Sequence, residues 1–134
     1  MNISTINFLA VFAAAASYFL IGGVWYSALF SNAWMEANGF TKEQVAAFNK
    51  PRTFIWSFIF ALVMSFNLAM YLNDAKTTAA WGATAGFLAG FGWVALSIGV
   101  TGLFENRSWK YIFVNGGYQT IAFTVMGAIL GAWR

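Results

Sequence analysis

Few side chains in this sequence could carry out chemistry, and only one pair of charged residues stands in a suggestive place. Glu105 and Arg107 follow a long apolar run, and the polar residue Asn115 stands near the start of the next run. Turned inward, Glu105 could meet Arg107, Tyr26 or Asn115 and form a polar plug or a ligand anchor. Turned outward, the two charges would simply lie at the boundary with solvent. Both interpretations fit the residue types.

The chain contains no cysteine and no histidine. Disulfides, thiolate or imidazole metal sites and His-ligated haem are therefore excluded. The commonest general base and the Cys- and His-dependent nucleophiles are missing as well. An enzyme acting on lipids would have to rely on Glu105, Asp74 and hydroxyl groups, without paired carboxylates. We therefore expect no catalytic activity, no cofactor and no bound metal.

A second candidate site consists of polar and aromatic residues inside the apolar runs. Asn115 and Gln119 are four residues apart, so on a helix they face the same neighbour. Such residues mark a pathway or ligand site in some membrane proteins and join helices in others. Joining is favoured here, because none of these side chains is normally ionised. The interior set is Tyr18, Asn67, Trp93, Tyr118 and Gln119.

Composition defines the elements that must position these residues. The chain has 134 residues, of which 60% are hydrophobic and 8% charged, against about 25% charged in soluble domains. The apolar residues form four runs long enough to cross a bilayer. We predict an all-α integral membrane protein, with a four-helix transmembrane bundle as one domain over residues 1–134. The predicted helices span about 6–30, 53–72, 78–104 and 109–133, and we expect the first to be a retained helix rather than a signal peptide.

Residues 31–52 form the one substantial loop, and we expect it to lie on the membrane surface as one or two short helices. Gly39 suits the end of a first short helix. Thr41 and Gln44 have the spacing of a capping box, which predicts the start of a second. Pro51, the only proline, is expected to end this segment.

Aromatic residues mark the expected membrane boundaries, because their amphipathic rings favour the headgroup level. Trp25, Tyr26, Trp34, Trp56 and Trp109 fall on one side of an antiparallel threading, and Tyr71, Trp81 and Trp133 fall on the other. Only Trp93 is left at mid-helix, where its indole N–H needs a partner inside the protein or in lipid. The short connection 73–77 predicts that the second and third helices pack as a hairpin.

The third helix carries glycine at every fourth position, and the fourth helix has a second pair. A glycine face lets another helix approach closely. Three partners remain open: a helix of the same chain, a second copy or another protein, or the tail of a lipid, quinone or carotenoid. The predicted packing glycines are Gly82, Gly86, Gly90, Gly127 and Gly131.

Two segments resemble the bacterial family named domain of unknown function 1761. The first runs from Gly22 to Phe30 with the motif Gly-Gly-Val-Trp-Tyr-Ser-Ala-Leu-Phe and continues at Trp34. The second comprises Phe104-Glu105-Asn106-Arg107, residues 115–118 and residues 126–131. Ala28 departs from the proline usual after Trp-Tyr-Ser. The resemblance implies a small four-helix membrane protein and supplies no catalytic residues, since the family has no assigned activity.

Two functions fit these observations. The first is a non-catalytic scaffold or accessory subunit that packs through its glycine-rich faces, as a homo-oligomer or in a larger membrane complex. The second is a small oligomeric transporter or channel for a neutral or lipophilic solute. Five basic residues on the side of loops 31–52 and 105–109, against two on the other, favour a cytoplasmic placement of those loops in a bacterial inner membrane. No basic stripe supports a nucleic-acid partner.

Overall fold

Four long helices dominate the part of the chain that the computed structural model describes, residues 3–134. By length and composition all four are candidate membrane spans, over Phe8–Leu29, Lys50–Tyr71, Ala79–Phe104 and Trp109–Ala132. No strand occurs among these described residues. The predicted all-α fold and the helix count are confirmed.

Two of the spans contain a wide π-helical turn. The first span consists of α1 (Phe8–Val24) and the π-helical segment Trp25–Leu29. The third consists of α5 (Ala79–Ala89), the π-helical segment Gly90–Ala95 and α6 (Leu96–Phe104). The second and fourth spans are the uninterrupted helices α4 (Lys50–Tyr71) and α7 (Trp109–Ala132). A short 3₁₀ turn, Ile3–Thr5, precedes α1.

The loop between the first two spans folds as the local sequence predicts. Helix α2 (Ser31–Asn38) ends at Gly39, which has φ +69°. Helix α3 (Lys42–Ala46) begins at the Thr41–Gln44 capping box. The role predicted for Pro51 is wrong. It lies in the first turn of α4, where its missing N–H is harmless, and Asn49 caps this helix by accepting from the Arg52 N–H at 3.1 Å.

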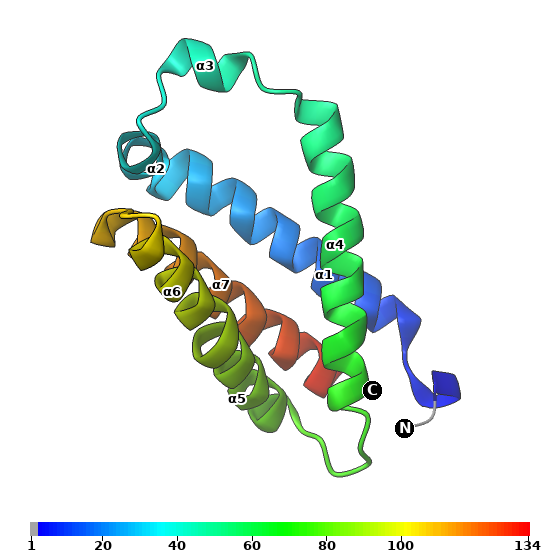
Figure 1. The fold of residues 1–134 in the computed structure, drawn as a ribbon. Coiled ribbons are helices and arrows are strands. Elements are labelled where there is room, and N and C mark those ends of the chain that lie inside the picture. The colour runs from blue at the N-terminus through cyan, green and yellow to red at the C-terminus, as the bar shows by residue number, and fades with distance from the viewer. Residues whose placement is uncertain (1–2) are drawn as a thin grey trace.

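The helices pack in the spatial order α4, α1, α7 and then α5 with α6 (Figure 1). The predicted hairpin of the second and third helices is therefore wrong: α4 rests on α1, whereas α5 lies along α7. Ring contacts join the two helices, with Phe8 of α1 against Phe66 of α4 and Phe12 against Phe58. At the same crossing the buried Ser65 hydroxyl donates to the Val11 carbonyl at 2.8 Å.

The closest helix contact joins α5 to α7. A methyl group on Gly82 would overlap the Gly127 carbonyl oxygen and lie 3.0 Å from its carbonyl carbon. A methyl group on Gly86 would likewise overlap the Phe123 carbonyl oxygen. Gly131 faces the Thr78 carbonyl in the same way, and Gly90 faces Phe123 and Gln119. The two glycine faces thus meet each other within one chain, and neither is left open for a second copy or a lipid tail.

Candidate functional site

A cluster of tyrosines lies between the first span and α7, and a π-helical turn in the backbone of the first span positions part of it. The π-helical turn after Val24 is closed by the Phe30 N–H, which donates to the Trp25 carbonyl at 2.8 Å. Inside this turn the Ser27 hydroxyl donates to the Gly23 carbonyl. Widened turns of this kind recur at functional sites. Here the turn carries the two aromatic residues that reach α7, Trp25 and Tyr26.

Four side-chain hydrogen bonds join the first span to α7. The Trp25 indole donates to the Val114 carbonyl at 2.9 Å, and the Tyr26 hydroxyl donates to Asn115 Oδ1 at 2.6 Å. Deeper in the bundle, the Tyr18 hydroxyl donates to Gln119 Oε1 at 3.0 Å. The Tyr118 hydroxyl returns across the interface and donates to the Tyr18 carbonyl at 2.7 Å. We call the six side chains the tyrosine cluster: Tyr18, Trp25, Tyr26, Asn115, Tyr118 and Gln119.

Tyr118 is the centre of the tyrosine cluster. Only 6% of its surface is exposed, and its ring lies 5.0 Å from the Tyr18 ring and 5.3 Å from the Tyr26 ring, centre to centre. The backbone of α1 gives it room, because a methyl group on Gly22 would lie 2.9 Å from its hydroxyl oxygen. A methyl group on Gly117 would lie 3.1 Å from the Trp25 ring. Glycine is therefore needed where these large rings cross the opposite backbone.

The chemistry available to the tyrosine cluster is neutral hydrogen bonding. Each of its hydroxyls donates to an oxygen of the opposite helix, and the Asn115 amide also donates to the Tyr111 carbonyl at 3.0 Å. Buried polar groups that satisfy one another fix helix register. This arrangement suits the joining of helices better than proton transfer, which needs a base.

Most of the predicted interior set comes together here, but two members do not. Tyr18, Tyr118 and Gln119 join Tyr26 and Asn115, as the four-residue spacing in α7 suggests. Trp93 is 72% exposed on the third span, away from the tyrosine cluster. Asn67 lies exposed on α4. Trp25 was expected only at the membrane boundary, and its bond to Val114 had no signal in the sequence.

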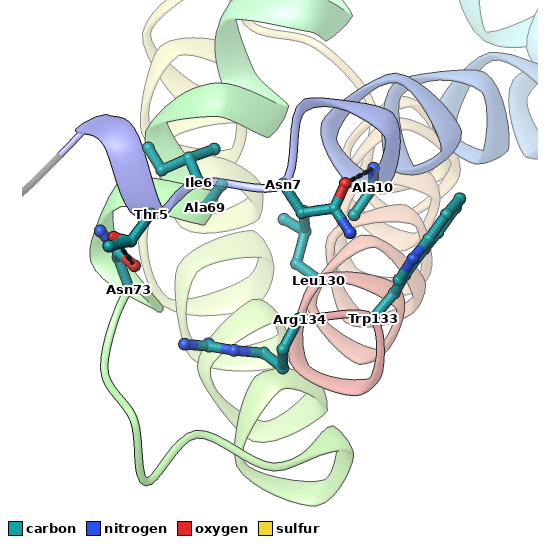
Figure 2. Close-up of a pocket in the computed structure, with 9 residues that line it drawn as sticks. All are labelled: Thr5, Ile6, Asn7, Ala10, Ala69, Asn73, Leu130, Trp133 and Arg134. Atoms are coloured by element: carbon teal, nitrogen blue, oxygen red, sulfur yellow. Dashed lines mark hydrogen bonds between the residues drawn. The ribbon is translucent and has the colours of Figure 1, made fainter.

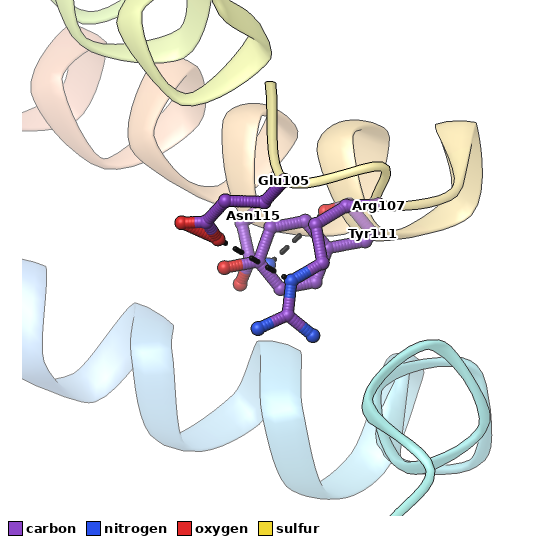
Figure 3. A network of polar contacts seen from close by, with 4 residues as sticks. All are labelled: Glu105, Arg107, Tyr111 and Asn115. Atoms are coloured by element: carbon purple, nitrogen blue, oxygen red, sulfur yellow. Dashed lines mark hydrogen bonds and ion pairs between the residues drawn. The ribbon is translucent and has the colours of Figure 1, made fainter. Parts of the chain in front are cut away.

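Glu105 and Arg107 lie in the turn between α6 and α7, and Figure 3 draws them with Tyr111 and with Asn115 of the tyrosine cluster. Arg107 Nε is 3.4 Å from Glu105 Oε1, with 40% and 49% of the two side chains exposed. The guanidinium carbon also lies 5.0 Å from the centre of the Tyr111 ring. An exposed pair of this kind contributes about 0–1 kcal/mol. The outward interpretation is therefore the better one for both charges.

A second exposed ion pair lies between the loop 31–52 and the bundle. Lys110 Nζ, at the start of α7, lies 3.0 Å from Glu36 Oε1 in α2. Aromatic contacts continue from there along the loop, from Tyr26 to Trp34, Phe40 and Phe48. The loop thus packs on the same end of the bundle as the tyrosine cluster. Sequence spacing could not indicate this pair, because its partners are far apart in the chain.

The opposite end of the bundle holds a small pocket lined by the chain's first described turn, the α4–α5 connection and the end of α7 (Figure 2). Arg134 donates to the Leu72 carbonyl at 2.5 Å and to the Asp74 carbonyl at 2.7 Å. The Thr5 hydroxyl donates to Asn73 Oδ1 at 2.8 Å. The pocket volume is about 20 Å³, which accommodates about one water molecule. This end closes the bundle and has no room for a cofactor.

The elements described define a class of protein: a small, all-helical membrane protein with four candidate spans. Among residues 3–134 no group of three or more carboxylate, His or Cys side chains could hold a metal ion. The sequence model of the family described as protein of unknown function (DUF1761) matches residues 9–131, nearly the whole chain. The chain belongs to this family. No curated protein and no solved structure shows significant similarity to it.

Proposed function

We propose that the protein is a non-catalytic scaffold or accessory subunit of a bacterial inner membrane, with loops 31–52 and 105–109 in the cytoplasm. The observation that carries this proposal is the tyrosine cluster, in which every hydroxyl is used to join the first span to α7. A bundle whose interior polar groups bond to one another offers a rigid body with an apolar exterior. Its working surface is then the outside of the bundle.

The placement of the acidic residues supports the absence of catalysis. The sequence contains four acidic residues, Glu36, Glu43, Asp74 and Glu105, and all of them lie outside the four spans. Proton-coupled transport needs an ionisable group within the membrane, along the path of the substrate. The exterior, by contrast, is rich in large apolar side chains, with Phe104 91% and Phe113 70% exposed. Lipid and other membrane helices are the partners that such a surface suits.

The scaffold role predicts that the protein is extracted from the membrane together with a second copy or another membrane protein. The test is extraction in polymer-bounded lipid discs, without detergent, followed by native mass measurement. We expect a mass that exceeds one chain plus lipid by a second copy or by another membrane protein. A lone chain in every disc, at expression levels matched to the natural host, would contradict the proposal. An abundant unrelated membrane protein prepared in parallel controls for random capture.

The second candidate function is a small oligomeric transporter for a neutral or lipophilic solute. Its supporting observation is the pair of π-helical segments in the first and third spans, since such turns recur at functional sites. In this case Gln119→Leu, which removes the acceptor of the Tyr18 hydroxyl, abolishes solute flux into liposomes. The control variant Ile121→Leu changes a residue of the same helix that is 47% exposed, and it should leave flux unchanged. Absence of flux in the wild type for every solute class tested would remove this candidate.

A further inference from the structure

The exposed face of α4 carries an amide that has no hydrogen-bond partner among residues 3–134. Asn67 is exposed, and its side chain makes no hydrogen bond to any of the described residues. It lies four residues before the end of α4 at Tyr71, about 6 Å inside that end. In lipid an unsatisfied amide costs several kcal/mol.

Two other asparagines of the chain show what an isolated helix can do with such an amide. Asn115 donates to the Tyr111 carbonyl at 3.0 Å, and Asn38 donates to the Trp34 carbonyl at 2.9 Å, each four residues back on its own helix. The equivalent acceptor for Asn67 is the carbonyl of Val63, and this bond is not made. Both the donor and the acceptor of the Asn67 amide are therefore unpaired within the described residues.

The surroundings of Asn67 form a continuous stripe along α4. Steps of three and four residues place five side chains within one quarter of the helix surface, which is the spacing of a helix–helix contact. The large members are more than half exposed: Trp56 is 54% exposed, Phe60 60%, Val63 55% and Tyr71 60%. We call this set the α4 stripe: Trp56, Phe60, Val63, Asn67 and Tyr71.

An open apolar groove borders the α4 stripe. Its volume is about 360 Å³, and Phe8 and Phe12 of α1 line it together with Leu62, Val63 and Phe66 of α4. Val63 belongs to both the stripe and the groove. Helices pack by fitting the side-chain ridges of one into the grooves of the other. A helix laid against the stripe could therefore place its own aromatic side chains into this hollow.

From the unpaired amide and the neighbouring groove we infer that the α4 stripe is the contact surface for a second copy of this chain. An amide is self-complementary, since two copies related by a two-fold axis exchange two N–H···O bonds. Copies inserted in the same orientation bring their α4 helices together in parallel, so that Asn67 meets Asn67 at the same depth. A different protein would need a polar group at that depth, whereas a second copy always supplies one. This inference rests on the proposed scaffold role and names its partner.

The test uses disulfide cross-linking, for which the absence of native cysteine is an advantage. Val63→Cys places a single thiol in the α4 stripe, and Val100→Cys is the matched control, a valine 57% exposed on α6. In native membranes under mild oxidation we expect a dimer band from Val63→Cys and none above background from Val100→Cys. Equal cross-linking of both variants, or none of either, would overturn the inference.

The amide itself is tested in the same background. Interhelical hydrogen bonds contribute about 0.6–2 kcal/mol in membranes, so Asn67→Leu should weaken dimerisation by about 3- to 30-fold. Asn67→Gln, which keeps the amide, should restore most of the cross-linking. Because Asn67 is exposed, neither change should impair folding, and helix content by circular dichroism checks this. Undiminished cross-linking in Asn67→Leu would overturn the amide pairing.

Cross-linking of Val63→Cys to a protein of another mass would reject the second copy while leaving the scaffold role intact. A lone chain in the lipid-disc measurement would reject the scaffold role itself. The two proposals can therefore fail separately. The second-copy inference depends on the identity of the cross-linked species, and the scaffold role depends on the native mass.

Discussion

Replacement of Gly82 by alanine should strongly destabilise the protein, whereas the same replacement at Gly92 should be harmless. The methyl group added at Gly82 overlaps the Gly127 carbonyl oxygen and lies 3.0 Å from the Cα of Gly131. Both obstacles are backbone, so no side-chain rotation relieves them, and α5 must move away from α7. Overpacking of a well-packed contact costs about 1–3 kcal/mol and occasionally more, and we expect at least about 3 kcal/mol here.

Gly92 is the matched control because it lies in the same membrane span and has no atom of a neighbour within 4 Å of the added methyl group. Alanine at that position should be neutral or stabilise the helix by up to about 1 kcal/mol. Both variants can be compared by unfolding in mixed micelles of increasing SDS content, with tryptophan fluorescence as the signal. Equal midpoints for Gly82→Ala and Gly92→Ala would show that the α5–α7 contact does not hold the bundle together.

The features that sequence predicted well are those that depend on short stretches of chain. Apolar length defines the four spans, and the Thr41 capping box and the Gly39 helix end are properties of a few adjacent residues. Pro51 was assigned the wrong role because proline suits both the end of one helix and the first turn of the next. The choice between them depends on the Asn49 cap, which only the folded backbone reveals.

The features that sequence missed depend on which helix faces which. A short connection suggested that the second and third spans pack together, but α4 packs on α1 instead. The direction of Trp93 was missed for a related reason. It lies inside the π-helical segment Gly90–Ala95, where each turn holds more residues than an α-helical turn and side chains change their direction. Counting α-helical turns from the glycine face therefore does not predict the direction of the Trp93 side chain.

The interior polar residues include contacts that sequence spacing predicted and contacts that it did not. The spacing of Asn115 and Gln119 on α7 correctly indicated a shared neighbour, and that neighbour is the first span. The bond from Trp25 to Val114 depends on the π-helical turn and left no pattern in the sequence. Asn67 has the same residue type as Asn115 but the opposite environment. Residue type alone could not separate a helix-joining amide from one that faces outward.

Tyr118 should be the most costly single side chain of the cluster to remove. Tyr118→Ala deletes a ring that is 6% exposed and touches Tyr18, Tyr26 and Trp25. Large-to-small changes of buried aromatic residues cost about 3–5 kcal/mol. Tyr118→Phe keeps the ring and loses only the bond to the Tyr18 carbonyl, which should cost about 0.6–2 kcal/mol. Phe113→Ala, on the same helix and 70% exposed, controls for the loss of an aromatic ring.

Gly22 allows a sharper test of this geometry through a double-mutant cycle. Alanine at Gly22 places a methyl group 2.9 Å from the Tyr118 hydroxyl oxygen but 3.2 Å from the ring carbon that bears it. Gly22→Ala should therefore be costly in the wild type and much less costly in Tyr118→Phe, where the hydroxyl is gone. Contacting residues typically couple by about 0.5–3 kcal/mol. Unfolding midpoints of the four proteins measure the coupling, and purely additive effects would mean that α1 and α7 do not meet at this hydroxyl.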